Sequence, residues 1–319
     1  MDMAVTFLGT GGSVPSARRS TASVLVTRGG EKLLFDCGEG TQRQMQRSLG
    51  LVQVDEIYLT HFHADHVLGL PGLLKTYDLT DRQVPLAVYG PPGLNQLFQV
   101  FAPLLGRLGF VVDLVELQSG DVVPHDGYEI RAFEAAHSAR ANGYALVEAE
   151  RPGRFDPAAA AAAGVPEGPA YAALQRGEEV EGKAGVVAPD RVLGPARPGR
   201  VVVLSGDTAP SPATVSAAAD ADLLVHDCSF AEEEAQRAAE TGHSTVGQAA
   251  AVGAEAHVKL LALVHISSRY HVGQLLEEAR AVYEPTVAPK DFDVIEIPFP
   301  ERGEPHLVPN GAVDRDGPG

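Results

Sequence analysis

Short runs of apolar residues, many of them β-branched, alternate with turn-forming residues along most of the chain. Near the start these runs read MAVTFLGT, SVLVT, KLLFDCG and DEIYLTH, and Gly29-Gly30 supplies a hairpin turn. Later runs of the same character are PLAVYG, VVDLVEL, YEIRAFEA, NGYALVEAE, RVVVLSGD, DLLVHDCS, KLLALVHIS and DFDVIEIP. Each of these runs predicts a strand.

Apolar residues spaced three and four positions apart predict helices after some of these strands. Leu70, Leu73 and Leu74 belong to such a pattern over 66–79. Similar patterns fall at 212–219, 230–241, 244–256 and 271–283. Because several strands follow one another before helices intervene, a doubly wound parallel sheet fits poorly. Two packed sheets flanked by helices fit better.

Residues 151–199 interrupt the alternation with a stretch dense in proline, glycine and alanine. A connection this long inside a domain is either a flexible linker or a functional insertion. Counting Arg200, the segment carries seven basic and six acidic residues, so it is nearly neutral in an otherwise acidic chain. Composition alone leaves both interpretations open.

Composition narrows the class of protein. The chain has 319 residues, of which 45% are hydrophobic and 21% charged, as expected of a globular protein. No run approaches the ~18 consecutive apolar residues that a membrane span needs, and the first residues do not resemble a signal peptide. Cys37 and Cys228 are the only cysteines, which favours a reducing cytoplasm. A net charge of −17 argues against non-specific adhesion to nucleic acid, so a polyanionic substrate would need local metal or arginine contacts.

Three histidines and an aspartate fall within six positions of YLTHFHADHVLGLPGLL, residues 58–74: His61, His63, Asp65 and His66. The strand predicted before them ends at Thr60, so His61 and His63 can point to the same side of the following loop. Imidazole and carboxylate groups are suited to zinc or a similar divalent ion. This density of ligand-type residues predicts a metal site.

Three further ligand-type residues follow predicted strands. His137 lies in EAAHSARANGYAL, Asp207 in VVVLSGDTAP and His265 in LLALVHISSRY. Each one alone is weak, because a histidine or aspartate at a strand end is usually an ordinary turn residue. The repetition of one context, an apolar strand followed by a ligand and then by small or polar residues, predicts that they join the same site.

These motifs together resemble the metallo-β-lactamase superfamily, and more closely its ribonuclease Z branch, the tRNA 3′-end endonucleases. HxHxDH at 61–66 marks only the superfamily. The branch is indicated by the HISSRY run around His265, GHST at 242–245 and the inserted segment with GVPEGP at 164–169. FLGTGGSVPS at 7–16 and FDCGEGTQRQM at 35–45 extend the similarity, which spans residues 3 to about 299.

The resemblance implies an α+β fold, a four-layer αββα sandwich. A single hydrolase domain would span residues 1–319, with a protruding tRNA-binding arm inserted at about 151–199. It also implies two divalent metal ions per chain, with Zn²⁺ the first candidate and Mn²⁺ the second. One ion would be held by His61, His63 and His137 and the other by Asp65, His66 and His265, with Asp207 bridging both. Precursor tRNA as substrate, a homodimer, a cytoplasmic location and no membrane association complete these expectations.

The resemblance also implies roles in catalysis. Asp65 would accept a proton from the attacking water, and His243 in GHST would be the general acid for the leaving ribose oxygen. Asp36 would orient a ligand imidazole. Asp227, at a position where the family usually has glutamate, would orient His243.

Phosphate contacts are expected in three places besides the metal ligands: an N-terminal loop, Arg269 and the arm. The family often shows P-x-K-x-R-N where this chain has Pro15-Ser16-Ala17-Arg18-Arg19-Ser20, so lysine is replaced by Ala17 and asparagine by Ser20. Arg269 follows a ligand closely and is the better candidate near the metals. In the arm, Gly168-Pro169 would shape the tip, and the expected phosphate contacts are Arg151, Arg154, Arg176 and Lys183.

Two other functions remain open from the sequence. A hydrolase of the same fold could act on small phosphodiesters or other esters, but the arm would then serve no purpose. A non-catalytic RNA-binding protein with a structural metal is disfavoured, because structural zinc normally has four closed ligands.

Overall fold

The computed structural model describes residues 1–310. The chain divides into two compact units. The larger consists of Met1–Pro124, Ile130–Leu146 and the chain from Val201 onward, and the smaller of His125–Glu129 and Val147–Arg200. The smaller unit therefore contains the whole segment 151–199.

The first sheet has eight strands in the order β17-β16-β1-β2-β3-β4-β5-β6. In chain order they are β1 (Met3–Gly9), β2 (Ser23–Arg28), β3 (Glu31–Phe35), β4 (Glu56–Tyr58), β5 (Leu86–Gly90), β6 (Val112–Glu116), β16 (Val294–Glu296) and β17 (His306–Val308). Neighbours from β17 to β3 pair antiparallel, and those from β3 to β6 pair parallel. The loop after β4 therefore leaves the parallel half of this sheet, and it carries the HxHxDH motif.

The second sheet has seven strands in the order β15-β14-β13-β12-β9-β8-β7. They are β7 (Val122–His125), β8 (Tyr128–Glu134), β9 (Asn142–Glu148), β12 (Val201–Leu204), β13 (Leu223–Asp227), β14 (Leu260–Val264) and β15 (Thr286–Val287). Strands β12 to β15 run parallel. Because parallel strands end at the same edge of a sheet, the residues that follow β12, β13 and β14 are brought to one edge.

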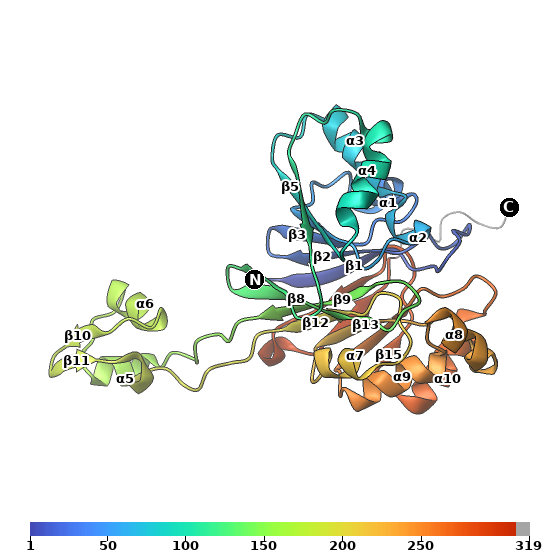
Figure 1. Cartoon of the computed structure of the whole chain (residues 1–319). Coiled ribbons are helices and arrows are strands. Elements are labelled where there is room, and N and C mark those ends of the chain that lie inside the picture. Colours follow the sequence, from blue (N-terminus) through green and yellow to red (C-terminus); the bar gives the residue numbers. More distant parts are fainter. Residues whose placement is uncertain (311–319) are drawn as a thin grey trace. The chain divides into compact units, whose positions relative to one another are not determined.

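Helices cover the outer face of each sheet in the larger unit (Figure 1). Those on the first sheet are α1 (Thr41–Ser48), α2 (Ala64–Val67), α3 (Leu70–Leu79) and α4 (Leu94–Leu105); those on the second are α7 (Pro212–Ala217), α8 (Ala235–Thr241), α9 (Val246–Glu255) and α10 (Val272–Val282). Short 3₁₀ turns occur at Glu232–Glu234 and Pro300–Arg302. This arrangement confirms the predicted αββα sandwich.

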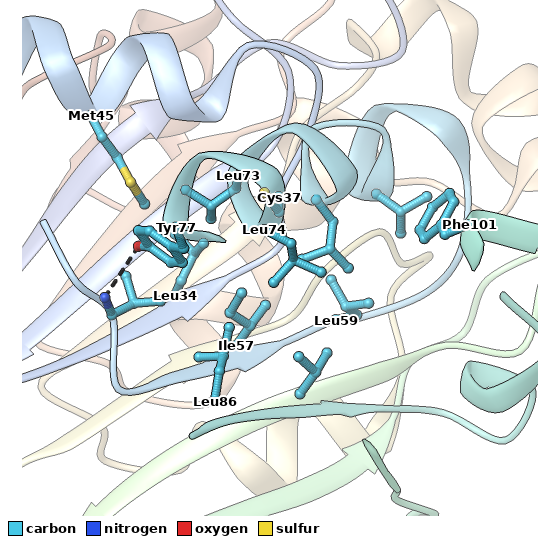
Figure 2. Packing of buried hydrophobic residues seen from close by; sticks show 14 of the residues in the cluster. Leu34, Cys37, Met45, Ile57, Leu59, Leu73, Leu74, Tyr77, Leu86 and Phe101 are labelled. Carbon is cyan, nitrogen blue, oxygen red and sulfur yellow. Dashed lines mark hydrogen bonds between the residues drawn. The ribbon is translucent and has the colours of Figure 1, made fainter. Parts of the chain in front are cut away.

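One apolar core lies between the first sheet and its helices. Figure 2 shows Leu73, Leu74 and Tyr77 of α3 packed over Ile57 of β4 and Leu86 of β5. The Tyr77 hydroxyl donates to the carbonyl of Val52 at 2.7 Å and accepts from the amide of Val54 at 3.2 Å. Burial of these side chains at roughly 1.5–3 kcal/mol each anchors the segment that leads into HxHxDH.

The smaller unit is folded, with its own apolar core. It contains α5 (Pro157–Ala162), α6 (Pro169–Gln175), the hairpin of β10 (Val180–Gly182) and β11 (Gly185–Val187), and a 3₁₀ turn at Pro189–Arg191. Its buried core consists of Ala160, Val165, Leu174, Val187 and Val192. Asp156 caps α5 by accepting from the amides of Ala158 and Ala159. The alternative of a flexible loop for this segment does not match the structure.

A buried ion pair closes the smaller unit at its two chain ends. The Arg200 guanidinium donates from Nε to Oε2 and from Nη2 to Oε1 of Glu148, both at 2.8 Å. Both side chains are almost fully buried. Two-point pairing of this kind fixes the ends of the segment geometrically.

Several elements differ from the sequence-based expectations. Helices α1, α4, α5 and α6 and strands β7, β10, β11, β15 and β17 were not predicted. The helix expected over 66–79 is divided into α2 and α3 at Leu68 and Gly69. Asp36 does not lie in a strand, because β3 ends at Phe35 and Asp36 has a φ of 57°. This left-handed turn aims its carboxylate at the residues after β4.

Candidate metal centre

The HxHxDH segment makes a sharp turn from β4 into α2. His61 is buried, His63 is exposed and stands as the N-cap of α2, and Asp65 and His66 lie in the single turn of that helix. The helix begins at Ala64, two residues before the pattern predicted over 66–79, so Asp65 lies in its first turn. The four side chains therefore come from one short segment whose backbone is set by the strand on one side and the helix on the other.

The three downstream residues reach the same place from the second sheet. His137 follows β8, Asp207 follows β12, and His265 directly follows β14 with a φ of 60°. Nitrogen and oxygen atoms lie within 4.8 Å of one another in each of two groups, one of His61, His63, His137 and Asp207 and the other of Asp65, His66 and His265. The structure thus brings together all seven residues predicted as ligands.

Asp207 belongs to the first group and also lies beside the second. Its Oδ2 atom is 3.7 Å from Nε2 of His61, 3.3 Å from Nε2 of His66 and 3.4 Å from Nε2 of His265. Oδ2 of Asp65 is 3.1 Å from the same nitrogen of His265, and Nε2 of His137 is 3.2 Å from Nδ1 of His63. One carboxylate oxygen is therefore close to imidazoles of both groups, as a bridging ligand requires.

The donor atoms suit a divalent cation. Within residues 1–310, Nε2 of His61 and Nε2 of His66 are buried and have no hydrogen-bond partner. Buried polar atoms without a partner are costly unless a ligand or ion satisfies them. Imidazole nitrogens with carboxylate oxygens form a donor set typical of zinc and related metals. The residues present therefore fit metal ions at both groups.

The electrostatics of the cluster also favour positive charge. Burial lowers the pKa of His265, but the carboxylates of Asp207, Asp65 and Asp227 raise it by more, to about 9. For His66, burial likewise lowers the pKa, and Asp207 and Asp36 raise it well above its ordinary value. Burial lowers the pKa of His61, with His66 contributing, and burial also lowers that of His137. The region around Asp207 and Asp65 thus attracts a proton or a cation.

Asp36 and Thr60 contact the Nδ1 atoms of His66 and His61 and so orient their rings. Oδ2 of Asp36 is 2.8 Å from Nδ1 of His66. The Thr60 hydroxyl donates to Asp36 at 2.9 Å and lies 3.0 Å from Nδ1 of His61. One carboxylate therefore orients a histidine of each group, directly in one and through a hydroxyl in the other.

Asp227 holds His243, as the sequence predicts. Its Oδ2 is 2.8 Å from Nδ1 of His243, and the shorter side chain of aspartate reaches the ring without an intervening group. Burial lowers the pKa of His243, but the hydrogen bond and charge of Asp227 raise it by more. His243 is thus held beside the metal cluster, with Nδ1 4.0 Å from Asp207.

Comparison with known proteins connects this geometry to a family. The family model described as anti-Pycsar protein Apyc1 matches residues 3–147. Ribonuclease Z of Methanosarcina acetivorans is 47% identical over 299 residues, covering 92% of this chain and 98% of the relative. Ribonuclease Z of Haloferax volcanii is 48% identical over 305 residues, covering 94% and 96%. The chain belongs to the ribonuclease Z family.

Solved structures agree with this assignment. The short form of human tRNase Z superimposes with a TM-score of 0.66 at 28% identity, covering 92% of this chain and 99% of that one. The metallo-β-lactamase fold protein YhfI of Bacillus subtilis has a TM-score of 0.68 at 20% identity, covering 93% and 100%, and supports the fold alone. The family and fold implied by the sequence motifs are both confirmed.

The loop of residues 15–20, which departs from the ribonuclease Z pattern, contains two arginines that differ from each other in exposure. Arg18 is exposed. Arg19 is half-buried, and its Nη1 donates to the carbonyl of Pro289 at 2.9 Å and to the hydroxyl of Thr10 at 2.5 Å. Arg19 therefore braces the loop, and Arg18 is the one available to a phosphate. Arg269, the other candidate, is about half exposed and contacts Glu234 at 3.4 Å.

Three residues of this ribonuclease Z site were not predicted: Ser13, Thr60 and Ser229. The amide of Ser13 donates to Oδ2 of Asp65 at 2.8 Å. Thr60 and Ser229 each present a hydroxyl to the Nδ1 atom of a predicted ligand. Thr60 directly precedes the HxHxDH motif, and Ser229 lies two residues after Asp227. A hydroxyl residue close in sequence to a predicted site residue could therefore have indicated both. Ser13 contributes only its backbone, which no residue type reveals.

Proposed function

We propose that this chain is a metal-dependent endoribonuclease that removes the 3′ trailer from precursor tRNA by two-metal phosphodiester hydrolysis. The observation that carries the proposal is the position of Asp207 Oδ2, within 3.7 Å of His61 in one ligand group and of His66 and His265 in the other. A carboxylate shared in this way is what two adjacent cations need. The family membership supplies the class of substrate.

Two divalent ions per chain are proposed, Zn²⁺ first and Mn²⁺ as the other candidate. His61, His63 and His137 would hold one, Asp65, His66 and His265 the other, and Asp207 both. Two ions roughly 3.5–4 Å apart supply positive charge to the phosphodiester and lower the pKa of water. The buried Nε2 atoms of His61 and His66, which lack a hydrogen bond within residues 1–310 and face the Asp207 carboxylate, support this assignment.

Proton transfers are assigned to two side chains. Burial raises the pKa of Asp65, but the hydrogen bond from His265 and the charge of His66 lower it by more, so Asp65 is ionised, the form in which a carboxylate can accept a proton. His243 has Nδ1 engaged by Asp227, which leaves Nε2 to deliver a proton to the departing ribose oxygen. The proposed base is thus a carboxylate among the metal ligands, and the proposed acid is an imidazole beside them.

The smaller unit is proposed to bind the body of the tRNA. Of the four residues expected to contact phosphate, Arg176 is paired with Glu178 at 2.7 Å and the guanidinium of Arg151 donates to the carbonyl of Pro198. Arg154 and Lys183 are exposed and make no ion pair within residues 1–310, and Arg191 shares both properties. These three are the proposed phosphate contacts.

A homodimer and a cytoplasmic location are proposed from the family resemblance. No helix within residues 1–310 is long and apolar enough to cross a membrane. Sedimentation of the purified protein would test the assembly: a species of twice the 33.5 kDa chain mass supports the dimer. A single species at the chain mass would oppose it.

The proposed activity is tested by incubating a precursor tRNA with the protein and Zn²⁺ or Mn²⁺, with a chelator in a parallel reaction. A small chromogenic phosphodiester serves as the second substrate. We expect a single cut that releases the 3′ trailer, abolished by the chelator. Hydrolysis of the small ester with no cleavage of the precursor would support the alternative of a general phosphodiesterase. Binding of RNA with no hydrolysis of either substrate would support a non-catalytic protein.

A further inference from the structure

A single hydroxyl group connects the proposed general acid to a proposed metal ligand. Oγ of Ser229 lies 2.6 Å from Oδ1 of Asp227, 2.7 Å from Nδ1 of His265 and 3.2 Å from Nδ1 of His243. The other oxygen of Asp227 is 2.8 Å from Nδ1 of His243. Ser229 is 6% exposed, so water does not compete freely for these contacts. Two histidines with different proposed tasks therefore share one carboxylate–hydroxyl pair.

The directions of these hydrogen bonds follow from the number of protons. Ser229 has one hydroxyl proton, and it donates this proton to the carboxylate of Asp227, which can only accept. At His265 the serine oxygen must then act as acceptor, so Nδ1 of that ring carries the proton. Nε2, which lies 3.1 Å from Asp65 and 3.4 Å from Asp207, is left as the nitrogen that can coordinate a cation.

Asp227 is fixed by further donors, so it does not swing between its partners. Its Oδ2 also accepts from the amide of Thr208 at 3.2 Å and from the amide of Ser244 at 3.3 Å. The side chain is fully buried. A carboxylate held by two amides gives Ser229 a fixed acceptor, and Ser229 in turn gives His265 a fixed acceptor.

The same device occurs a second time in the cluster, on the other sheet. Thr60 donates its hydroxyl proton to Asp36 and lies 3.0 Å from Nδ1 of His61. There too a carboxylate orders a hydroxyl, and the hydroxyl faces the Nδ1 atom of a proposed ligand. Two independent occurrences, one in each ligand group, indicate that the arrangement serves the imidazoles and is more than local packing.

We propose that Ser229 is a positioning residue that fixes the ring and tautomer of His265 for metal binding, and that it couples this ligand to His243 both directly and through Asp227. The proposal rests on the proposed function, which assigns His265 as a ligand and His243 as the acid. Loss of the hydroxyl leaves Nδ1 of His265 without its acceptor and removes a donor from Asp227, so both groups lose orientation.

The test compares Ser229→Ala with Ser211→Ala, which removes the hydroxyl that caps α7 and contacts no histidine. Affinity for Zn²⁺ is measured by competition with a chelating dye in the absence of RNA. We expect Ser229→Ala to weaken binding of one ion by about 10–100-fold, the usual effect of removing an outer hydrogen-bond partner of a metal ligand. Ser211→Ala should bind both ions as the wild type does. Unchanged affinity in Ser229→Ala would overturn the proposal.

A double-mutant comparison isolates the path through His265. If Ser229 acts on the metal through that ring, adding Ser229→Ala to His265→Ala should cause no further loss of Zn²⁺ affinity. Losses that multiply in the double variant would mean a general structural effect and would overturn the proposal. With the small phosphodiester, Ser229→Ala should lower kcat and leave KM unchanged, because it touches the cluster and no substrate surface; a change confined to KM counts against it.

The outcomes separate this inference from the proposed function. A wild-type protein that binds no divalent ion defeats the metal centre itself. A wild-type protein that binds two ions, with Ser229→Ala unaffected, defeats only the role given to Ser229.

Discussion

The backbone amide of Ser13 donates a hydrogen bond of 2.8 Å to Oδ2 of Asp65. Ser13 has a φ of 60°, a conformation that places its amide toward the site. The preceding Gly12 lies against His265: a Cβ atom there would be 2.5 Å from the carbonyl oxygen of His265 and 2.6 Å from its Nδ1. The loop that orients the proposed base is therefore seated directly on a proposed ligand.

Gly12→Ala should reduce catalysis by displacing this loop. The added methyl group has no room, so the loop must shift away from His265 and the Ser13 amide must leave Asp65. Displacement of a positioned group by about 1 Å can cost on the order of 10² in rate. The measurement is kcat on the small phosphodiester, with Gly30→Ala as the control, since no atom of residues 1–310 lies within 4 Å of a Cβ at Gly30. Equal kcat values for the two variants would refute the role of the loop.

His243→Ala should separate catalysis from metal binding. His243 is assigned as acid and not as ligand, so the variant should retain both ions. Its rate should fall by about 10²–10⁴, the usual contribution of general acid–base catalysis. Metal content and single-turnover cleavage of precursor tRNA are measured on the same preparation. Loss of metal, or cleavage at the wild-type rate, would show that the assignment is wrong.

The pH dependence should reveal Asp227 acting on His243. The pKa of His243 is raised above 6.5, because the effect of Asp227 exceeds that of burial. A general acid must be protonated, so kcat is retained below this pKa and lost as the pH rises through it. Asp227→Asn removes the charge and should move the alkaline limb of the profile to lower pH.

The control for this profile is Asp222→Asn. Asp222 is also buried, but it pairs with Lys259 and contacts no residue of the cluster. The alkaline limb of the kcat profile of Asp222→Asn should coincide with that of the wild type. A limb in Asp227→Asn that stays in place, or moves to higher pH, contradicts the assignment of the acid.

Deleting the arm should affect precursor tRNA and spare a small substrate. The segment 155–195 contains the whole small core of Ala160, Val165, Leu174, Val187 and Val192, while the Glu148–Arg200 pair lies outside the deletion and can close the gap. With a short Gly/Ser linker in its place, hydrolysis of the small phosphodiester should continue. KM for precursor tRNA should rise strongly, because a binding surface for the body of the tRNA is lost. Equal losses on both substrates would assign the arm to folding or assembly.

Point substitutions in the arm should distinguish available cations from engaged ones. Arg154→Ala should weaken precursor tRNA binding and reduce the slope of log affinity against log salt by about 1. Arg176→Ala is the matched control, because Arg176 is already paired with Glu178. Salt titrations of binding at fixed metal concentration provide the measurement. The same slope for Arg154→Ala and the wild type would remove Arg154 from the interface.

Four of the seven proposed ligands could be predicted because ligand-type residues are so dense in HxHxDH, and the other three because each follows an apolar strand. Strands of a packed sheet end at shared edges, so residues such as Asp207 and His265 converge without any long-range information beyond the fold. The neighbours that orient them could not be predicted in the same way. Ser13 acts through its amide and Asp36 through a left-handed turn, and both depend on backbone geometry that tertiary contacts impose.

Helices were harder to predict than strands for local reasons. Helix α4 has Leu94, Phe101 and Leu105 buried at helical spacing but contains Pro103, which weakens the helical signal. In the arm, Asp156 followed by Pro157 and an alanine run is a helix-start pattern. The many glycines and prolines around this pattern argued against a helix in the sequence. The small core that stabilises these short helices forms only in the folded unit.

The count of metal ions per chain tests the central claim most directly. Elemental analysis of purified protein loaded with Zn²⁺ and freed of excess should find two ions per chain. His63→Ala should lower this number, while His306→Ala, at an exposed position outside the cluster, should not. Two ions in the wild type with fewer in His63→Ala is the result predicted here. One tightly held ion and no second site, or two ions unaffected by His63→Ala, would contradict the two-metal centre built around Asp207.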